Sequence, residues 1–352
     1  MDVYFGTMGS AAEGIYRTQF LTDTGRFRSA QLVAQVQSPN FLTQHPNDAI
    51  LYAVCKGERV PSIIAYKIKK DGTLHEFSRM DSPQGLACHV CVHPSGRFLL
   101  TAHYSAGAIS AFPLDERGKI GQPKVYAHSG SSGIVAKRQA SAHPHWTGFS
   151  PDGRYALIPD LGLDQIIIYK VEIGVELLSK HAIAETDPGA GPRHMRFSNN
   201  GKFIYLLNEL QSSVTVFSWD ADTGTCRRIA SYETLSEQVR SREGFNSAAE
   251  ILVHPQLNCV YTSNRGHDSI TVFQMNNLTD KLRPIQTQAI RGAFPRHISL
   301  SPKGDWLLAA GMHSNTVSAH RVDPSNGQLR YATKAIVTVP SPSCIIFLDA
   351  TH

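Results

Sequence analysis

A unit of about 50 residues recurs seven times along this chain, and this repeat constrains the fold more than any other feature. Its middle is a strand that runs into a His-Pro or Ser-Pro turn and then into a second apolar strand. The clearest copies lie at residues 92–100, 149–157 and 300–308, and degenerate ones at 44–48, 197–203 and 253–257. Proline presets φ for the first corner of a tight turn, and the glycine that follows supplies the corner that needs a positive φ. Each copy therefore predicts a β-hairpin.

The rest of each unit predicts two more strands. A strand of alternating polar and apolar residues follows the hairpin, for example at 107–112, 165–169, 213–217 and 269–273. A turn rich in Asp and Gly then leads to a fourth strand, as at 70–74, 116–120 and 222–225. Four short strands per unit, without a long amphipathic helix, are typical of a propeller blade rather than of a solenoid or a sandwich. We expect an all-β, seven-bladed β-propeller with four antiparallel strands per blade.

The two ends of the chain predict how the ring closes. Residues 3–7 look like a blade without its leading strand, and residues 343–348 look like a leading strand with nothing after it. We expect these terminal strands to share one blade, because closure removes the sheet edges that an open array would expose. Seven units take up nearly the whole length, so we expect a single domain over residues 1–352 without a linker.

Composition argues against several classes of function. The formal net charge is +5, and the basic residues are scattered rather than gathered with aromatic ones, so we expect no nucleic-acid partner. No run approaches the roughly 18 apolar residues of a membrane span, and strand residues begin directly after Met1. We therefore expect a cytoplasmic protein without membrane association. The six cysteines fall mostly on predicted strands and are expected to be reduced and buried.

Cys88 and Cys91 form a Cys-x-x-Cys pair, which is half of a zinc pattern. Residues three apart on a strand point to opposite faces, and no second Cys/His pair lies at a ligand-like interval. We interpret the pair as core cysteines of an inner strand rather than as a metal site. The chain also carries no nucleotide motif or phosphate-binding glycine loop, and we expect neither a metal nor an organic cofactor.

Candidate functional residues belong at the central axis, where inner strands and the loops that enter them converge. Ionisable groups are unusually frequent at the predicted axial positions, and a buried charge needs a partner or a ligand. The inner strands carry His89, His143, His145, Arg193, His194, Glu250, Arg296 and His297, and the turns after the second strands carry His103, Tyr104, Asp160, Glu209, Arg265 and His313. The set predicts a polar cleft that binds an anion, although any single member could instead cap a loop or pair with a neighbouring blade.

Four of these residues occupy corresponding rim positions in three successive blades and combine a base, an acid and two cations. They are His145, Glu209, Arg193 and Arg265. We take these four as the candidate catalytic residues, and His103, His143, His194, Glu250 and Arg296 as candidate substrate-binding residues.

Residues 189–195 read Gly-Ala-Gly-Pro-Arg-His-Met, and residues 208–214 read Asn-Glu-Leu-Gln-Ser-Ser-Val. Together they resemble the signature of the seven-bladed lactonase family, which joins propeller-type bacterial 6-phosphogluconolactonases to fungal carboxy-cis,cis-muconate cyclases. Further likeness at 3–7, 14–16, 141–145 and 263–265 spans the chain. Carried over position by position, the resemblance implies an active site at the same four candidate catalytic residues.

Hydrolysis of a six-membered sugar lactone needs an activated water, a stabilised oxyanion and, for a phosphorylated substrate, cations that hold a dianion. His145 or Glu209 would be the general base, while Arg193 and Arg265 would stabilise the oxyanion or bind the phosphate. No Gly-x-Ser-x-Gly elbow or Cys-His nucleophile pair stands out, which favours direct attack by water. The resemblance thus implies a lactonase of the 6-phosphogluconolactonase type, acting on a small anionic sugar lactone without an obligate protein partner.

Two alternatives remain open at this level. The same residues suit a muconate-type cyclase, which closes a lactone by adding a carboxylate across a double bond. A propeller can also be a non-catalytic platform that binds a ligand or a protein on the same rim. Two long polar connections, at 127–139 and 236–246, would either cover the cleft or simply join blades.

Overall fold

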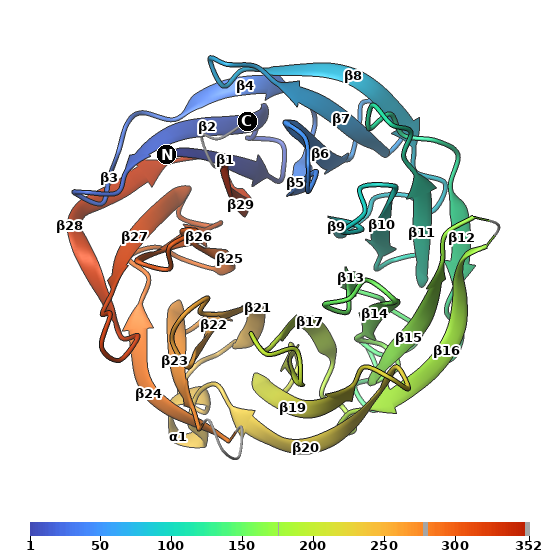
Figure 1. The fold of residues 1–352 in the computed structure, drawn as a ribbon. Helices are drawn as coiled ribbons and strands as arrows, with labels where there is room; N and C mark the ends of the chain where they lie inside the picture. Colours follow the sequence, from blue (N-terminus) through green and yellow to red (C-terminus); the bar gives the residue numbers. More distant parts are fainter. Residues whose placement is uncertain (175, 277–280, 349–352) are drawn as a thin grey trace.

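The computed structural model describes residues 1–348 apart from 175 and 277–280, and within this part the strands form seven antiparallel sheets around a central axis (Figure 1). Each sheet is one blade, and its strands run in order from the axis outward. Blade 1 contains β5 (Pro39–Gln44), β6 (Ile50–Cys55), β7 (Ser62–Ile68) and β8 (Leu74–Asp81). Blade 2 contains β9 (His89–Val92), β10 (Phe98–His103), β11 (Ala108–Pro113) and β12 (Lys124–Ala127). Blade 3 contains β13 (Gly148–Phe149), β14 (Tyr155–Asp160), β15 (Gln165–Glu172) and β16 (Leu177–Glu185).

The remaining blades follow the same order. Blade 4 contains β17 (Pro192–Phe197), β18 (Phe203–Asn208), β19 (Ser213–Asp220) and β20 (Thr225–Glu233). Blade 5 contains β21 (Ser247–Val253), β22 (Cys259–Arg265), β23 (Ser269–Met275) and β24 (Leu282–Ala289). Blade 6 contains β25 (Pro295–Leu300), β26 (Trp306–Gly311), β27 (Thr316–Val322) and β28 (Leu329–Thr338). Blade 7 contains β29 (Pro342–Leu348), β1 (Asp2–Thr7), β2 (Gly14–Leu21) and two short outer strands, β3 (Arg26–Phe27) and β4 (Gln31–Gln35).

Blade 7 closes the ring in the way that the sequence predicts. The C-terminal strand β29 is the inner strand and pairs with β1 over a register that runs from Asp2 opposite Leu348 to Gly6 opposite Cys344. Figure 1 shows β1 and β29 side by side in this blade. The seven-bladed, four-stranded prediction is therefore confirmed, while the last four residues of the expected domain, 349–352, lie outside the described part.

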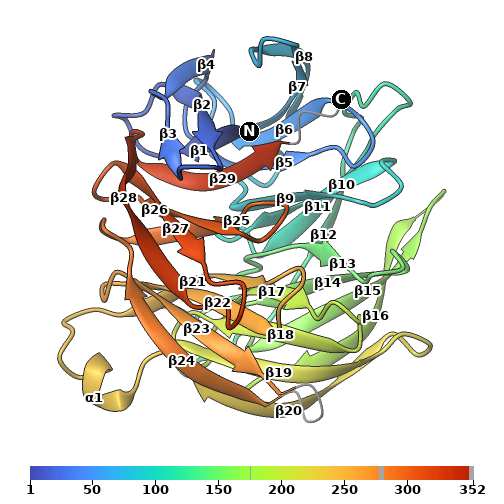
Figure 2. The same ribbon diagram turned by 60° about the vertical axis from the view of Figure 1, so that its left-hand side comes forward.

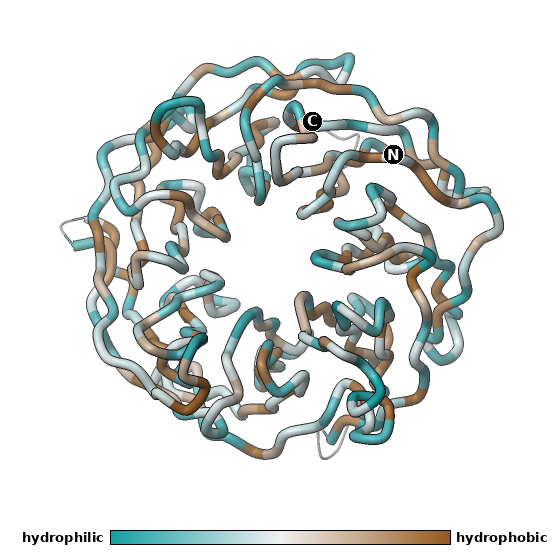
Figure 3. The backbone as a smooth tube through the Cα atoms, turned by 180° about the vertical axis from the view of Figure 1, so that it is seen from behind, coloured by the Kyte–Doolittle hydropathy of each residue, from teal (hydrophilic) through white to brown (hydrophobic). Residues whose placement is uncertain are grey.

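The apolar core is divided among the spaces between blades. Each of seven buried clusters combines side chains of two consecutive blades, as where Phe20 of blade 7 meets Trp306 of blade 6 at 5.4 Å between ring centroids. In Figure 3 hydrophobic segments accordingly run along the strands, while hydrophilic segments are frequent at the turns. Alternation along each strand explains this, because successive side chains face the two neighbouring blades in turn.

Two kinds of polar contact recur between neighbouring blades. Imidazoles of His-Pro turns lie beside a glycine carbonyl in the following blade's turn, at 3.2 Å for His45 and Gly96, 2.9 Å for His93 and Gly153, and 3.0 Å for His254 and Gly304. Tyrosine hydroxyls of second strands donate to a glycine carbonyl in the next blade's outer hairpin, at 2.7 Å for Tyr4 and Gly72, 2.8 Å for Tyr52 and Gly118, and 2.8 Å for Tyr261 and Gly327. The repeated turn glycines are therefore docking points between blades as well as corners.

A β-bulge recurs near the start of the inner strand. The register of β17 with β18 skips Arg193, that of β25 with β26 skips Arg296, and that of β5 with β6 skips Asn40. An extra residue re-aims its side chain and breaks the strict alternation of faces. Consecutive inner-strand residues that the sequence places at the axis, such as Arg193 and His194, can therefore both face it, which strict alternation would not allow.

The connection between blades 4 and 5 contains the short helix α1 (Glu237–Arg240), which projects from the body in Figure 2. No helix of the described residues is long and apolar enough to cross a membrane. All six cysteines are free; Cys55, Cys259 and Cys344 are buried, and the other three are partly buried.

Candidate functional site

Two sets of positions bring functional side chains to one end of the axis. The first set lies at the start of the inner strands: Arg193 and Arg296 at the bulges of β17 and β25, and His145 before β13, directly after the bridge between Pro144 and Asp160. The second set is the end of the second strand, where Glu209 follows β18 and Arg265 ends β22.

Asparagines hold this second set in place. Asn208 Nδ2 donates to Ser213 Oγ at 2.9 Å and Thr215 Oγ1 at 2.8 Å, which ties the end of β18 to β19. Asn264 makes the same pair of bonds in blade 5. Each asparagine therefore fixes the chain one residue before a charged side chain of the site.

Glu209 is the centre of the site. It is 4% exposed and receives three arginines: Arg193 Nε at 2.9 Å, Arg265 Nη2 at 3.1 Å and Arg138 Nη2 at 2.5 Å. Oε2 faces Arg193, Arg265 and, at 4.0 Å, the Nε2 atom of His145, while Oε1 faces Arg138. We call the side of the site that faces Oε2 the deep side, and the side that faces Oε1 the rim side.

The two deep arginines are further held by backbone. Arg193 Nη1 donates to the carbonyl of Ala249, and Arg265 Nη2 donates to Ser247 Oγ and, at 3.0 Å, to the carbonyl of Ala248. Their guanidinium groups are rigid parts of the site, since buried donors without partners would cost free energy.

Electrostatics at this centre favour an ionised carboxylate among cations. Burial alone would raise the pKa of Glu209, but Arg265 and Arg193 hold that pKa well below its ordinary value. Burial lowers the pKa of Arg265 to about 9 and, with repulsion from Arg193, that of Arg296 to about 10. Arg296 makes no hydrogen bond or ion pair with any part of the chain that the structure describes, so its donors are available to a ligand.

His145 lies against this cluster as a neutral imidazole. Burial, Arg193 and His194 together hold the pKa of His145 well below 6.5. The ring of His194 lies 5.3 Å from the ring of His145, between centroids. A neutral imidazole can accept a proton, which is the property required of a general base.

Cys88 is a neighbour of His145 that the sequence did not reveal. Its Sγ atom lies 4.0 Å from His145 Nδ1 and donates to the carbonyls of His145 at 3.4 Å and Ala102 at 3.5 Å. Burial raises the pKa of this thiol to about 11. Cys91 Sγ lies 3.2 Å from Thr147 Oγ1, so both thiols face blade 3. The expectation that strand alternation separates the two cysteines is therefore wrong, because Cys88 lies before the first residue of β9, outside the regular strand pairing.

The rim beside Oε1 of Glu209 is polar. Tyr104 and His143 stack with their ring centroids 4.3 Å apart, and His143 Nδ1 lies 2.7 Å from the carbonyl of Tyr104. Arg138 Nη2 lies 3.4 Å from Tyr104 Oη while it binds Glu209. Arg138 belongs to the connection at 127–139, and sequence reasoning missed it because a loop arginine has no repeat position to mark it.

The rim beside Arg265 is aromatic instead. Phe294 lies under the guanidinium of Arg265 at 5.3 Å and stacks with His313 at 4.0 Å between centroids. Phe245, from the connection at 236–246, stacks on Phe294 at 6.2 Å and is 53% exposed. Both long connections thus contribute a side chain to the rim.

A second buried cluster lies one residue further along the inner strands. Glu250, 0% exposed, accepts from Arg196 Nη2 at 3.0 Å and lies 2.9 Å from His194 Nδ1 and 3.4 Å from His297 Nε2. Burial holds the pKa of His194 well below 6.5 and lowers that of His297 to about 4. Arg196 also lies over the Trp146 ring at 5.6 Å.

The structure therefore sorts the sequence candidates into three groups. His145, Arg193, Glu209 and Arg265 meet in one cluster, with Arg296 and His143 at its edge. His194 and Glu250 lie in the deeper cluster. His103 is fully buried, with Nε2 2.8 Å from Thr101 Oγ1 and Nδ1 3.2 Å from the carbonyl of Gly85, so it supports the strand end and its neighbour Tyr104 faces the rim.

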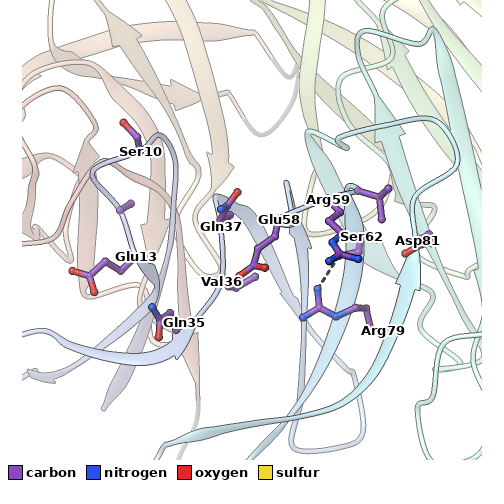
Figure 4. Close-up of a pocket in the computed structure, with 13 residues that line it drawn as sticks. Ser10, Glu13, Gln35, Val36, Gln37, Glu58, Arg59, Ser62, Arg79 and Asp81 are labelled. Carbon is purple, nitrogen blue, oxygen red and sulfur yellow. Dashed lines mark hydrogen bonds between the residues drawn. The ribbon is translucent and has the colours of Figure 1, made fainter.

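Two cavities lie away from this cluster. One of about 750 Å³ between blades 7 and 1 is lined by charged side chains that include Glu13, Glu58 and Arg59 (Figure 4). Its Arg79 is already paired with Glu76 at 2.7 Å. Another, of about 560 Å³, opens at the other end of the axis beside His89, Trp146 and His297. The Glu209 cluster is the candidate site because it combines a buried carboxylate, an imidazole and several arginines, although both cavities lie elsewhere. No group of three His, Cys, Asp or Glu in the described residues has the arrangement of a metal site.

Comparison with known proteins agrees with this architecture. A family model described as a seven-bladed β-propeller lactonase matches residues 2–347. A 6-phosphogluconolactonase of Bacillus subtilis is 30% identical over 357 residues, which cover 99% of each chain. One of Formosa agariphila is 32% identical over 345 residues, or 95% of each chain. The solved structure of a periplasmic gluconolactonase of Pseudomonas aeruginosa matches with a TM-score of 0.91 at 27% identity, over 99% of each chain.

Proposed function

The chain belongs to the seven-bladed β-propeller lactonase family, and from that premise we propose that it hydrolyses 6-phosphoglucono-δ-lactone at the Glu209 cluster. The observation that carries the proposal is the position of a neutral imidazole, His145, beside a carboxylate that holds three arginines, with a fourth arginine, Arg296, left available. A neutral base next to fixed cations suits addition of water to a carbonyl that becomes negatively charged.

His145 is the better of the two candidate bases. The carboxylate of Glu209 is ionised but committed to three guanidinium groups, so proton uptake there would disrupt the cluster. His145 takes a proton from water as the water oxygen attacks the lactone carbonyl carbon. Oε2 of Glu209, 4.0 Å from His145 Nε2, stabilises the imidazolium that forms.

Arg296 and Arg193 would stabilise the oxyanion. The carbonyl oxygen gains negative charge in the tetrahedral intermediate, and fixed donors aimed at it lower the barrier because they need no reorganisation. When the ring carbon–oxygen bond breaks, the imidazolium of His145 returns its proton to the leaving ring oxygen. The product is an open-chain acid, which ionises to a carboxylate.

A non-catalytic platform that binds a ligand or a protein is the competing function, and the tryptophans argue against it. Binding platforms usually expose large aromatic side chains. Trp146, Trp219 and Trp306 are 8%, 7% and 4% exposed, so all three serve blade packing.

We also propose a cytoplasmic location, supported by six free cysteines, since oxidising compartments favour disulfides.

The test is turnover of freshly generated 6-phosphoglucono-δ-lactone by the purified protein, with the spontaneous rate subtracted. We expect a clear excess over spontaneous hydrolysis and a preference over unphosphorylated glucono-δ-lactone. A carboxymuconate substrate is assayed in parallel for cyclisation. Turnover of the muconate alone would replace hydrolysis with lactone closure, and turnover of none would favour the non-catalytic alternative.

A further inference from the structure

Arg138 differs from the other two arginines that bind Glu209. Its side chain is 37% exposed, whereas those of Arg193 and Arg265 are 2% and 7% exposed. It comes from a connecting segment rather than from a strand. Its contacts in the described residues are Glu209 Oε1 and, more weakly, Tyr104 Oη.

The backbone beside Arg138 is fixed even though its side chain is partly free. Gln139 is fully buried, and its Nε2 donates to the carbonyl of Leu161 at 2.8 Å and to Asp164 Oδ1 at 2.7 Å. The N–H of Arg138 donates to the carbonyl of Val135 at 2.8 Å. The guanidinium can therefore change partner by side-chain rotation, without movement of the segment.

Release of Arg138 from Glu209 would leave that carboxylate well compensated. Arg193 and Arg265 both hold Oε2, on the deep side, while Arg138 alone among the three holds Oε1. A phosphate dianion carries more charge than a carboxylate and accepts the planar fork of arginine in a bidentate manner. It would compete successfully for the one exchangeable guanidinium.

We propose that Arg138, with Tyr104 and His143 beside it, forms the subsite for the 6-phosphate of the lactone. The Oε1 carboxylate oxygen of Glu209 occupies the place of the phosphate in the ligand-free protein. This inference rests on the proposed function and makes Arg138 the residue that selects the phosphorylated over the plain lactone.

The geometry of the rim gives the substrate one orientation. The reacting carbonyl belongs on the deep side with His145, and the phosphate, on the carbon farthest from the carbonyl carbon, belongs on the rim side. The opposite rim, at Phe294 and Phe245, presents rings rather than unpaired cations and suits the apolar face of a sugar.

The experiment compares Arg138→Ala and Arg138→Lys with a matched control, Lys137→Ala, which removes one exposed positive charge from the same segment. The ratio of kcat/KM for 6-phosphoglucono-δ-lactone to that for glucono-δ-lactone is measured for each. We expect Arg138→Ala to lower kcat/KM about 10- to 100-fold for the phosphorylated lactone and less than about 3-fold for the plain one. Arg138→Lys should lose less activity on the phosphorylated lactone than Arg138→Ala, and Lys137→Ala should keep the wild-type ratio of the two kcat/KM values.

Equal losses on both lactones, or no loss on either, would overturn the subsite. Calorimetric binding of 6-phosphogluconate and gluconate decides the same question if the wild type hydrolyses neither lactone. Tighter binding of the phosphorylated acid that disappears in Arg138→Ala supports the subsite even though the proposed reaction has failed. A preference that persists in the variant, or is absent from the wild type, rejects it.

Discussion

At the scale of single residues, the chemistry of the site depends on one buried carboxylate. Glu209 offsets the charges of Arg193 and Arg265, which are otherwise desolvated cations, and it also faces His145. Residue types and repeat positions predicted that these four side chains would meet. They did not predict Arg138, which lies in a segment without a repeat position, or the choice between His103 and Tyr104, which depends on where the strand ends.

Variants of His145 and Glu209 should distinguish a residue needed for turnover alone from one needed for both turnover and stability. His145→Ala removes the proposed base and should lower turnover by about 100-fold or more, with a stability change within about 1 kcal/mol. Glu209→Gln should also abolish turnover, but it leaves buried arginines uncompensated and should lower the free energy of unfolding by about 3 kcal/mol. Initial rates and urea unfolding measure both effects. A Glu209→Gln protein of wild-type stability would contradict the supporting role.

Cys88 tests whether water or a thiolate attacks the lactone. The thiol lies 4.0 Å from His145 Nδ1, but burial raises its pKa to about 11, so it stays protonated. Cys88→Ala should therefore keep kcat within about 3-fold of the wild type. A loss of more than about 100-fold, together with a burst of product that indicates an acyl-enzyme, would replace direct hydrolysis with covalent catalysis.

At the scale of elements, the strands and hairpins were predictable and the bulges were not. Pro-x-Gly turns and alternating apolar residues mark the hairpins, and β15, β19 and β23 begin at the predicted residues 165, 213 and 269. A bulge such as that at Arg193 has no sequence mark, because it depends on the pairing partner. Arg193 and Arg296 enter the site from such bulges, so these residues could be named from sequence while the directions of their side chains could not.

The contacts of His-Pro turns should stabilise the interface between blades without affecting the site. His93 Nε2 lies 2.9 Å from the carbonyl of Gly153, and the ring stacks on Phe98 at 4.7 Å. His93→Ala should lower the free energy of unfolding by about 2 kcal/mol through the lost hydrogen bond and packing, with kcat/KM unchanged. The exposed His75→Ala is the control in urea unfolding. Equal stability of the two variants would show that the turn contact is not a significant link.

Gly153 itself is constrained by the same contact. Its φ is +72°, and a Cβ atom there would lie 3.0 Å from His93 Nε2. Gly153 therefore meets two requirements, the backbone conformation of its own hairpin and the close approach of the preceding blade. The turn glycines at 96, 201 and 304 likewise approach a side chain of the preceding blade's turn, whereas the degenerate turns at 45–48 and 254–257 contain no glycine.

At the scale of the whole molecule, ring closure joins all seven interfaces into one structure. The β1–β29 pairing was predictable because two incomplete units at the ends of the chain complement each other. Burial of histidines was harder to foresee, since the same residue type lies in turns, strands and site. The structure buries several histidines in the interior, where loss of hydration disfavours the protonated imidazolium.

These buried histidines make stability depend on pH. The pKa values of His103, His297 and His320 are each lowered to about 4 by burial, whereas an unfolded histidine has a pKa of about 6.5. Between these values the unfolded chain binds protons that the folded chain does not, so the free energy of unfolding falls as the pH drops from about 6.5 to 4. Glu209, with its depressed pKa, adds a further loss at lower pH. Each histidine contributes about 3 kcal/mol over its window.

Urea unfolding at several pH values between 8 and 4 checks this dependence, with His320→Gln as the matched variant. His320 is fully buried in β27, distant in the fold from the Glu209 cluster. The variant loses one titrating group, so its stability should fall by about 3 kcal/mol less than that of the wild type between pH 6.5 and 4. Its activity should keep the wild-type pH profile. A wild-type stability that stays flat over this range would mean that the histidines gain protons in the folded protein, and water would then have to reach the side chains that the fold buries.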